Sequence, residues 1–253
     1  MKNNVLIGLL GVIWLVLMAD IIWQGTEGRW SIADAEKIGN LEVAKFAKQI
    51  VVVAVSDDGA NLCLYERKTD GVEWKAIQEE QDKDVVQGYD NSKWQLIFET
   101  EAIIGKNGLG KTKEGDGKTP VGVFLFVEAF GILDNPGTKM NYTKVDKSHY
   151  WVDDSGSNYY NQFVSSKEVL KDWGSAEHIV EYEDSYQYVL ATSFNSERIP
   201  GKGSAVFLHC SSEKMEATAG CVAVPEVYMR EIMKRVEPSC ILIIDYEEKI
   251  LCY

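Results

Sequence analysis

Apolar residues in the body of the chain form short runs, and turn-forming residues separate these runs. Stretches such as SDDGAN, TDG and NPG stand between them. Runs of this length, rich in Val, Ile, Leu, Phe and Tyr and bounded by Gly, Asp and Asn, are typical of β-strands. We expect strands at 50–55, 62–68, 72–77, 94–104, 121–130, 186–194, 204–210 and 240–246. The pattern predicts a mainly β domain from residue 49 to residue 253.

Two segments have helical features instead. Pro225 suits a first helical position, Glu226 lies in the first turn, and Lys234 and Arg235 lie in the last, before Pro238. Residues 24–48 carry apolar side chains at roughly helical intervals among charges, which predicts a spacer helix. Residues 139–163 are aromatic and polar with little periodicity, and we expect long loops there that wall a cleft.

The first 23 residues differ in character from the rest. Val5 to Ala19 is an unbroken apolar run, and Ile21 to Trp23 extends it past Asp20. About 20 such residues span the hydrocarbon core of a bilayer as a helix. Leu17 stands where a cleavage site favours a small residue, so an uncleaved signal anchor is expected, with a cleaved signal peptide as the alternative. Lys2 precedes the run, so we expect the N-terminus in the cytoplasm and the domain outside at the cell membrane.

Charge and cysteine content narrow the function. The 253 residues carry 26 Lys+Arg against 39 Asp+Glu, a net charge of −13. Nucleic acid is therefore not an expected partner, because phosphate affinity comes from Lys and Arg. The five cysteines form no CxxC pair, and in an exported domain this odd number leaves at least one thiol unpaired. Pairing among Cys63, Cys210, Cys240 and Cys252 stays open.

One motif suggests nucleotide binding but lacks the structure that this function requires. Residues 105–112, GKNGLGKT, match the phosphate-binding pattern GxxxxGK[ST]. That mechanism needs a helix to begin at the lysine. Gly115, Gly117, Pro120 and Gly122 follow within ten residues and are incompatible with a sustained helix. We expect no nucleotide and no other cofactor.

The candidate chemistry is a histidine and a cysteine twelve residues apart. His209 ends the strand 204–210, where alternation places it on the face opposite Cys210. Cys221 follows Thr218, Ala219 and Gly220, which allow a tight turn whose amides could hold an oxyanion. The nearby helix N-terminus would favour a thiolate. Cysteine and histidine on adjacent segments are the minimal pair for nucleophilic acyl transfer.

These segments resemble a known family. GLGKTKEGDGKTPVGVF, then GKGSAVFLHC and TAGCVAV, are similar in this order to the L,D-transpeptidase catalytic domains of bacterial envelopes, over about residues 49–246. The resemblance implies a β-sandwich-like catalytic domain, Cys221 as nucleophile and His209 as general base. It also implies that Thr218 and Gly220 form the turn before the nucleophile, and that the substrate is a peptidoglycan stem tetrapeptide.

The chain departs from the family pattern at two positions. Ala219 stands where a histidine is usual and Ala223 where an arginine is common, and the His-to-Cys interval is short, which indicates a divergent subgroup. The acceptor is an amine of a second stem for a transpeptidase, or water for an L,D-carboxypeptidase. Candidate substrate contacts are Asn195 and Arg198, which could bind a carboxylate, and Tyr150 and Trp151 in the cleft loops.

Two further classes of function remain open. One is a cell-wall-binding module that keeps the fold without turnover. The other is a zinc site built from His149, His178, His209 and either Cys210 or Cys221. No HxxxH or CxxC spacing supports the zinc site, so no metal is expected.

Overall fold

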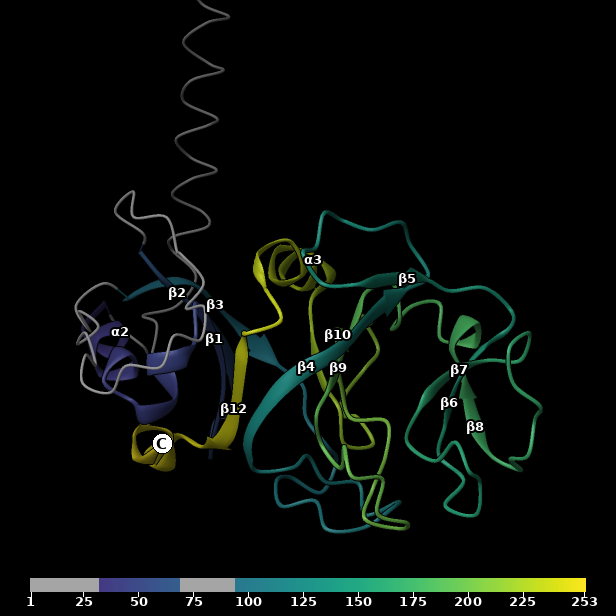
Figure 1. The fold of residues 1–253 in the computed structure, drawn as a ribbon. Helices are drawn as coiled ribbons and strands as arrows, with labels where there is room; N and C mark the ends of the chain where they lie inside the picture. The colour runs from purple at the N-terminus through teal and green to yellow at the C-terminus, as the bar shows by residue number, and fades with distance from the viewer. Residues whose placement is uncertain (1–31, 69–93) are drawn as a thin grey trace, which may run out of the picture.

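The computed structural model describes residues 32–68 and 94–253, which are dominated by one large mixed sheet (Figure 1). Eight of its strands follow the order β11-β10-β9-β4-β12-β1-β2-β3, and β5 pairs with β4. Their bounds are β1 (Gln49–Ser56), β2 (Gly59–Arg67), β3 (Trp94–Ala102), β4 (Gly122–Gly131), β5 (Tyr142–Lys144), β9 (Val189–Thr192), β10 (Phe207–Cys210), β11 (Val222–Val224) and β12 (Ile241–Tyr246).

The sheet curls until its two ends meet. An antiparallel bridge joins Ile103, just after β3, to Ala223 in β11. The result is a nearly closed barrel rather than the sandwich that the sequence analysis expected. The inward-facing residues of β1, β2, β9, β10 and β12 form its core, together with the buried face of helix α3 (Glu226–Arg235). Closing a sheet in this way leaves few unpaired strand edges.

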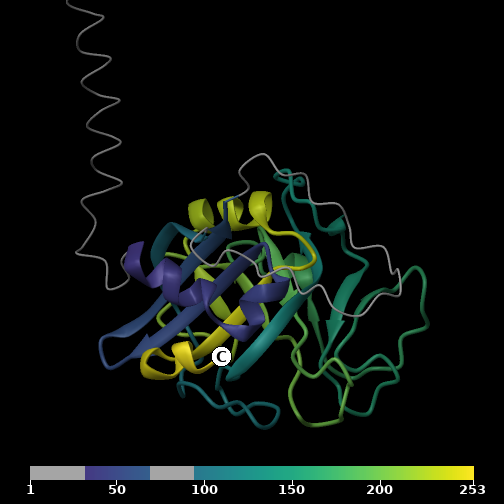
Figure 2. The ribbon, with the colours of Figure 1, turned by 60° about the vertical axis from the view of Figure 1, so that its left-hand side comes forward.

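Two outer layers cover the barrel (Figures 1 and 2). Helix α2 (Ile32–Gly39) and the 3-10 helices η1 (Glu42–Phe46) and η4 (Glu247–Cys252) lie over β1 and β12. Strand β1 is therefore buried on both faces, which explains its continuous apolar run. A three-stranded sheet of β6 (His149–Val152), β7 (Phe163–Ser165) and β8 (Ala176–His178), followed by η3 (Ile179–Glu181), covers the outer face of β9 and β10.

The mainly β class and the C-terminal helix are confirmed, with Pro225 as the N-cap of α3 rather than its first residue. The segment expected as one spacer helix differs: its described part forms α2 and η1, whose Ala35, Ile38 and Ala44 are buried against the sheet. The expected strand 72–77 and the expected anchor over 1–23 lie outside the described residues. No helix within the described ranges is long and apolar enough to cross a membrane.

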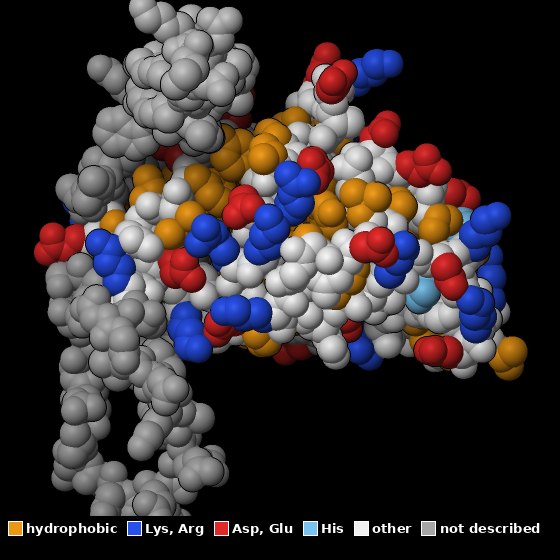
Figure 3. Space-filling model, turned by 90° about the horizontal axis from the view of Figure 1, so that it is seen from above, with side chains coloured by type: hydrophobic (Ala, Val, Ile, Leu, Met, Phe, Trp, Pro, Cys, Tyr) orange, Lys and Arg blue, Asp and Glu red, His pale blue; other side chains and the backbone are white. Residues whose placement is uncertain are grey.

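Positive and negative side chains are mixed on the face of the molecule that carries α3. Figure 3 shows Lys and Arg side chains interspersed with Asp and Glu, and hydrophobic side chains between them. The visible part of this face therefore has no continuous basic patch of the kind that follows a phosphate backbone.

Candidate functional site

Strands β10 and β11 place His209 and Cys221 on one face of the sheet. The two strands run parallel, with Leu208 opposite Val222 and His209 opposite Ala223. Cys221 immediately precedes β11 and packs with Phe207 in the hydrophobic cluster between the large sheet and the small three-stranded sheet. Cys210 and Leu208 belong to the barrel core on the opposite face. The alternation predicted from the sequence is therefore confirmed for Cys210.

The Cys221 thiol is buried and held by backbone groups. Its Sγ donates to the carbonyl oxygen of Ala205 at 3.1 Å and accepts from the amide of Phe207 at 3.3 Å. Burial, followed by the negative charge of Glu177, raises the pKa of Cys221 to about 12. The expectation of a thiolate favoured by α3 is therefore wrong, because loss of solvation outweighs the field at a helix N-terminus. The resting thiol of Cys221 is therefore neutral.

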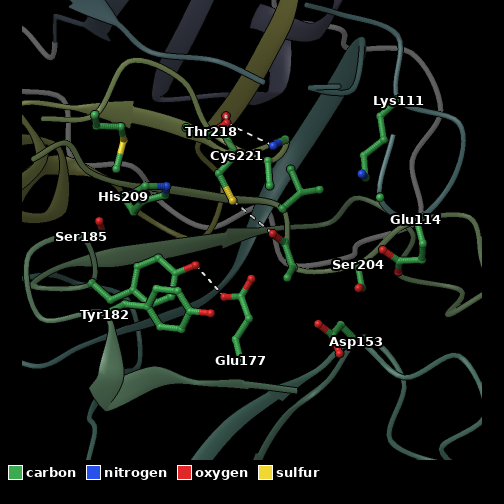
Figure 4. A pocket seen from close by; sticks show the side chains of 17 residues that line it. Lys111, Glu114, Asp153, Glu177, Tyr182, Ser185, Ser204, His209, Thr218 and Cys221 are labelled. Carbon is green, nitrogen blue, oxygen red and sulfur yellow. Dashed lines mark hydrogen bonds between the residues drawn. The ribbon is translucent and has the colours of Figure 1, made fainter. Parts of the chain in front are cut away.

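His209 is a neutral base in the same pocket. Burial lowers its pKa to about 4, and its ring packs edge-on against Tyr186 at 5.3 Å. Its Nδ1 lies 2.8 Å from the carbonyl oxygen of Cys210. Because a carbonyl only accepts, Nδ1 carries the proton and Nε2 keeps the lone pair that can accept one. Figure 4 shows the imidazole and the thiol beside the same cavity.

The turn before Cys221 is fixed by hydrogen bonds. Thr218 Oγ1 accepts from the Gly220 amide at 3.1 Å and donates to the Cys221 carbonyl at 2.7 Å. Gly220 has a φ of 149°, and a Cβ there would lie 2.8 Å from the Lys118 carbonyl oxygen, so only glycine fits. Thr218 and Gly220 therefore shape the turn. The Gly220 amide is already bonded, which leaves it unsuited to hold an oxyanion.

The pocket has a volume of about 380 Å³, and the residues that line it are far apart in the sequence. Besides Cys221, His209 and the turn 218–220, its lining includes Lys111, Glu114, Asp153, Glu177, Tyr182, Ser185, Tyr186 and Ser204 (Figure 4). No role in the site was predicted from the sequence for any of these eight residues. Glu114, Asp153 and Glu177 together are called the acidic wall below.

Lys111 comes from the segment that resembles a phosphate-binding loop. Residues 103–121 form turns and short bridges rather than a helix, and parallel pairing of Gly105 with Thr218 holds this loop against the turn before Cys221. Lys111 Nζ lies 3.1 Å from Asp116 Oδ1, with both side chains more than nine-tenths buried. Its positive charge acts to lower the pKa of Cys221, although burial outweighs it.

Asp116 organises this loop. Burial alone would raise its pKa, but the amides of Thr112, Lys113 and Lys118 and the Lys111 ammonium hold the pKa well below its usual range. The carboxylate therefore contributes stability above pH about 4, where it is ionised in the unfolded chain too, and loses that contribution as pH falls.

Replacing Asp116 should destabilise the protein strongly. Asp116→Ala leaves Lys111 as a buried unpaired cation, and breaking a buried pair costs about 3–5 kcal/mol. Urea unfolding at pH 7 measures the loss. Asp134→Ala, in the exposed pair with Lys144, is the matched control and should cost under about 1 kcal/mol. Equal losses in the two variants would contradict the assigned role of Asp116.

The predicted substrate contacts lie outside this pocket's lining. Asn195 is buried, and its side-chain amide bonds Ile199 and Gly203 of its own loop, while Arg198 is exposed. Tyr150 stacks on His178 with ring centroids 4.5 Å apart. Asn195 and Tyr150 thus have local structural partners, and Arg198 faces solvent. Their places in the structure do not support the predicted roles in binding a carboxylate or lining the cleft.

Trp151 supports the backbone around Cys221 indirectly. Its ring packs edge-on against Phe207 at 4.8 Å, and its Nε1 donates to Asn161 Oδ1 at 3.0 Å. The same oxygen accepts from the Ala205 amide at 3.2 Å, and the Ala205 carbonyl holds the Cys221 thiol. The aromatic segment thus fixes the backbone that orients Cys221.

The zinc alternative finds no matching geometry in the described ranges. His149 lies on β6 and His178 on β8, in the small sheet, whereas His209 lies on β10. No group of three or more His, Cys, Asp or Glu side chains within residues 32–68 and 94–253 is arranged to hold a metal ion. None of the five cysteines, all of which lie in the described ranges, forms a disulfide bond; four of them are buried and Cys252 is exposed.

No curated protein matches the chain in sequence. In fold, the helical cell shape determining protein Pgp2 from Campylobacter jejuni resembles it with 16% identity and a TM-score of 0.41, covering 85% of this chain and 55% of that one. An Enterococcus faecium L,D-transpeptidase gives 12% identity and a TM-score of 0.33, covering 79% of this chain and 49% of that one.

A third solved structure is that of L,D-transpeptidase 3 from Mycobacterium tuberculosis in complex with a faropenem-derived adduct, at 14% identity and a TM-score of 0.32. The match covers 79% of this chain and 60% of that protein. The chain thus spans about half to three fifths of the length of these proteins. The family model of the YkuD L,D-transpeptidase catalytic domain matches residues 80–244, most of the 253-residue chain. The protein therefore belongs to the YkuD L,D-transpeptidase catalytic domain family.

Proposed function

We propose that the protein is a peptidoglycan L,D-transpeptidase in which Cys221 forms an acyl-enzyme with a stem tetrapeptide. The observation that carries this proposal is the shared pocket of a buried thiol and a neutral imidazole whose Nδ1 proton is fixed by the Cys210 carbonyl. Such a pair can move a proton from sulfur to nitrogen as the thiol attacks a carbonyl. Membership of the family supports the choice of substrate.

The reaction begins with a rotation of the thiol. In the resting site the S–H points at the Ala205 carbonyl, so it turns toward His209 Nε2 when substrate enters. Sulfur then attacks the carbonyl that precedes the terminal D-residue, and His209 takes the proton. It gives this proton to the leaving amine as the tetrahedral intermediate collapses. The carbonyl oxygen becomes an oxyanion in this step. We assign its stabilisation to the Lys111 ammonium, which lies next to the turn at Gly220.

The acyl-enzyme then meets an acceptor. An amine of a second stem gives a cross-link, whereas water gives a tripeptide and makes the same site an L,D-carboxypeptidase. Incubation of the full-length protein with a tetrapeptide stem and product separation by chromatography test the choice. We expect a cross-linked dimer and a free D-amino acid. Tripeptide without dimer would favour the carboxypeptidase, and unchanged stem would favour a binding module without turnover.

We further propose that this reaction takes place outside the cytoplasm, with residues 1–23 as an uncleaved anchor. The apolar run from Val5 to Ala19 and the basic residue before it support this orientation. Retention of the intact N-terminus in membranes after a high-salt wash checks the proposal. A soluble protein that begins near Asp20 would instead indicate a cleaved signal peptide.

The raised pKa of Cys221 predicts slow alkylation of the resting enzyme. At pH 7 iodoacetamide should modify the exposed Cys252 before Cys221, because the thiolate is the reactive form. The rate at Cys221 should rise about tenfold for each pH unit from 7 to 9, since this range lies below its pKa. Peptide mass spectrometry measures both rates. A pH-independent rate at Cys221 would reveal a preformed thiolate and contradict the neutral resting pair.

A further inference from the structure

The acidic wall gathers three carboxylates from separate parts of the chain at one side of the pocket. Glu114 comes from the loop 103–121, Asp153 follows β6, and Glu177 lies on β8. Figure 4 shows Glu114 and Asp153 on the side of the pocket away from His209, and Glu177 between Tyr182 and Asp153. Glu177 is largely buried, and burial together with the charges of Asp153 and Glu114 raises its pKa to about 7. The three groups are therefore close enough to interact electrostatically.

The negative charge of this wall is not balanced from within the pocket. Among the described residues that line it, Lys111 is the one Lys or Arg, and its ammonium is paired with Asp116. His209 is neutral because burial lowers its pKa to about 4. The wall thus attracts a cation and repels a carboxylate.

Two polar atoms in this region are buried without a hydrogen-bond partner. Asp153 Oδ1 is one, and Ser204 Oγ is the other, on a side chain that is only 7% exposed and that lies beside the Tyr160 hydroxyl, whose pKa it acts to lower. Glu177 and Glu114 each have one oxygen engaged, by the hydroxyls of Tyr186 and Tyr160 respectively. Unpartnered polar atoms at such depth cost free energy unless a ligand or water completes them.

We propose that the acidic wall and Ser204 form a subsite for a primary ammonium group of a stem peptide. An ammonium has three N–H donors and no acceptor, so it matches a wall made of carboxylate oxygens and a hydroxyl oxygen. It also supplies the positive charge that the wall lacks. A neutral amide brings fewer donors and no charge, and a carboxylate brings only acceptors. This subsite rests on the proposed function, since it selects among the substrates of the same pocket.

The ammonium has two possible sources, and the experiment separates them on the full-length protein. In the donor arm, acylation is followed with two stems that carry a diamino acid before the terminal D-residue, one with a free side-chain amine and one acetylated. In the acceptor arm, a single acyl-enzyme partitions between an added amine and water. Both readouts are ratios for one protein preparation, so they do not depend on the fraction of each variant that is folded.

Asp153→Asn and Glu177→Gln keep the shape of the wall and remove two of its three carboxylates. We expect the wild-type preference for the free amine to fall at least about tenfold in one arm for Asp153→Asn, the usual effect of losing a charge-assisted hydrogen bond. The double variant should lose more. Asp184→Asn is the control, since Asp184 is exposed and does not line the pocket, and its ratios should match the wild type.

The outcomes distinguish failure of the ammonium subsite from failure of the proposed function. A fall in the donor arm places the ammonium on the acylating stem, and a fall in the acceptor arm places it on the attacking stem. Wild-type ratios in both arms for Asp153→Asn and for the double variant would overturn the subsite while leaving the proposed function intact. Absence of any adduct with either stem would overturn the proposed function, and the subsite with it.

Discussion

Cys221→Ala should abolish acyl-enzyme formation. Cys221 is the one cysteine among the residues lining the pocket, and Cys63, Cys210 and Cys240 are buried elsewhere, in the cores on either side of the sheet. These three buried thiols cannot take its place without refolding of the barrel, and the exposed Cys252 does not line the pocket. Intact-mass measurement after incubation with a tetrapeptide stem gives the result directly, as an adduct on the wild type and none on the variant.

Cys210→Ser is the matched control for this experiment. Cys210 sits eleven positions before the nucleophile but faces the barrel core, where its Sγ lies 3.8 Å from the Tyr188 carbonyl oxygen. Acylation should survive in this variant, although a buried hydroxyl in place of a thiol lowers stability somewhat. An essential Cys210 beside a dispensable Cys221 would show that the wrong thiol has been assigned.

His209→Ala should slow acylation by about 100-fold or more, the usual contribution of a positioned general base. The neutral thiol of Cys221 makes this base necessary, because a pKa of about 12 leaves almost no thiolate at pH 7. Single-turnover acylation followed by mass spectrometry measures the rate. The loss should persist at high stem concentration, since the imidazole acts in the chemical step.

His149→Ala controls for the loss of any histidine. His149 lies on β6, stacks on Phe163 with centroids 5.3 Å apart, and does not line the pocket. Its acylation rate should stay within about twofold of the wild type, as expected for a side chain remote from the reacting atoms. A rate for His209→Ala equal to that of His149→Ala would remove His209 from the mechanism.

The sequence predicted His209 and Cys221 as a pair on adjacent segments, and the structure places both beside one pocket because local rules determine this placement. Strand alternation places the side chains of His209 and Cys210 on opposite faces of the strand, and Gly220 before Cys221 predicts a tight turn. The mainly β class also followed from local patterns of apolar runs and turn residues. Closure of the sheet into a barrel did not, because it depends on the bridge from Ile103 to Ala223, which are far apart in the chain.

The rest of the site depends on contacts that one sequence does not reveal. Lys111 reaches the pocket only because Gly105 pairs with Thr218, and Asp153 and Glu177 arrive on the small sheet that covers β10. The protonation state of Cys221 was predicted wrongly for the same reason. A helix N-terminus can be read from Pro225 onward, but the burial that overrides its field is a property of the packed structure.

Intact-mass spectrometry of the full-length wild-type protein with a tetrapeptide stem tests whether Cys221 forms the acyl-enzyme. We expect a mass increase equal to the stem without its terminal D-residue, and peptide mapping should locate this adduct on Cys221. An unmodified protein after prolonged incubation, or an adduct on any residue other than Cys221, would contradict this expectation.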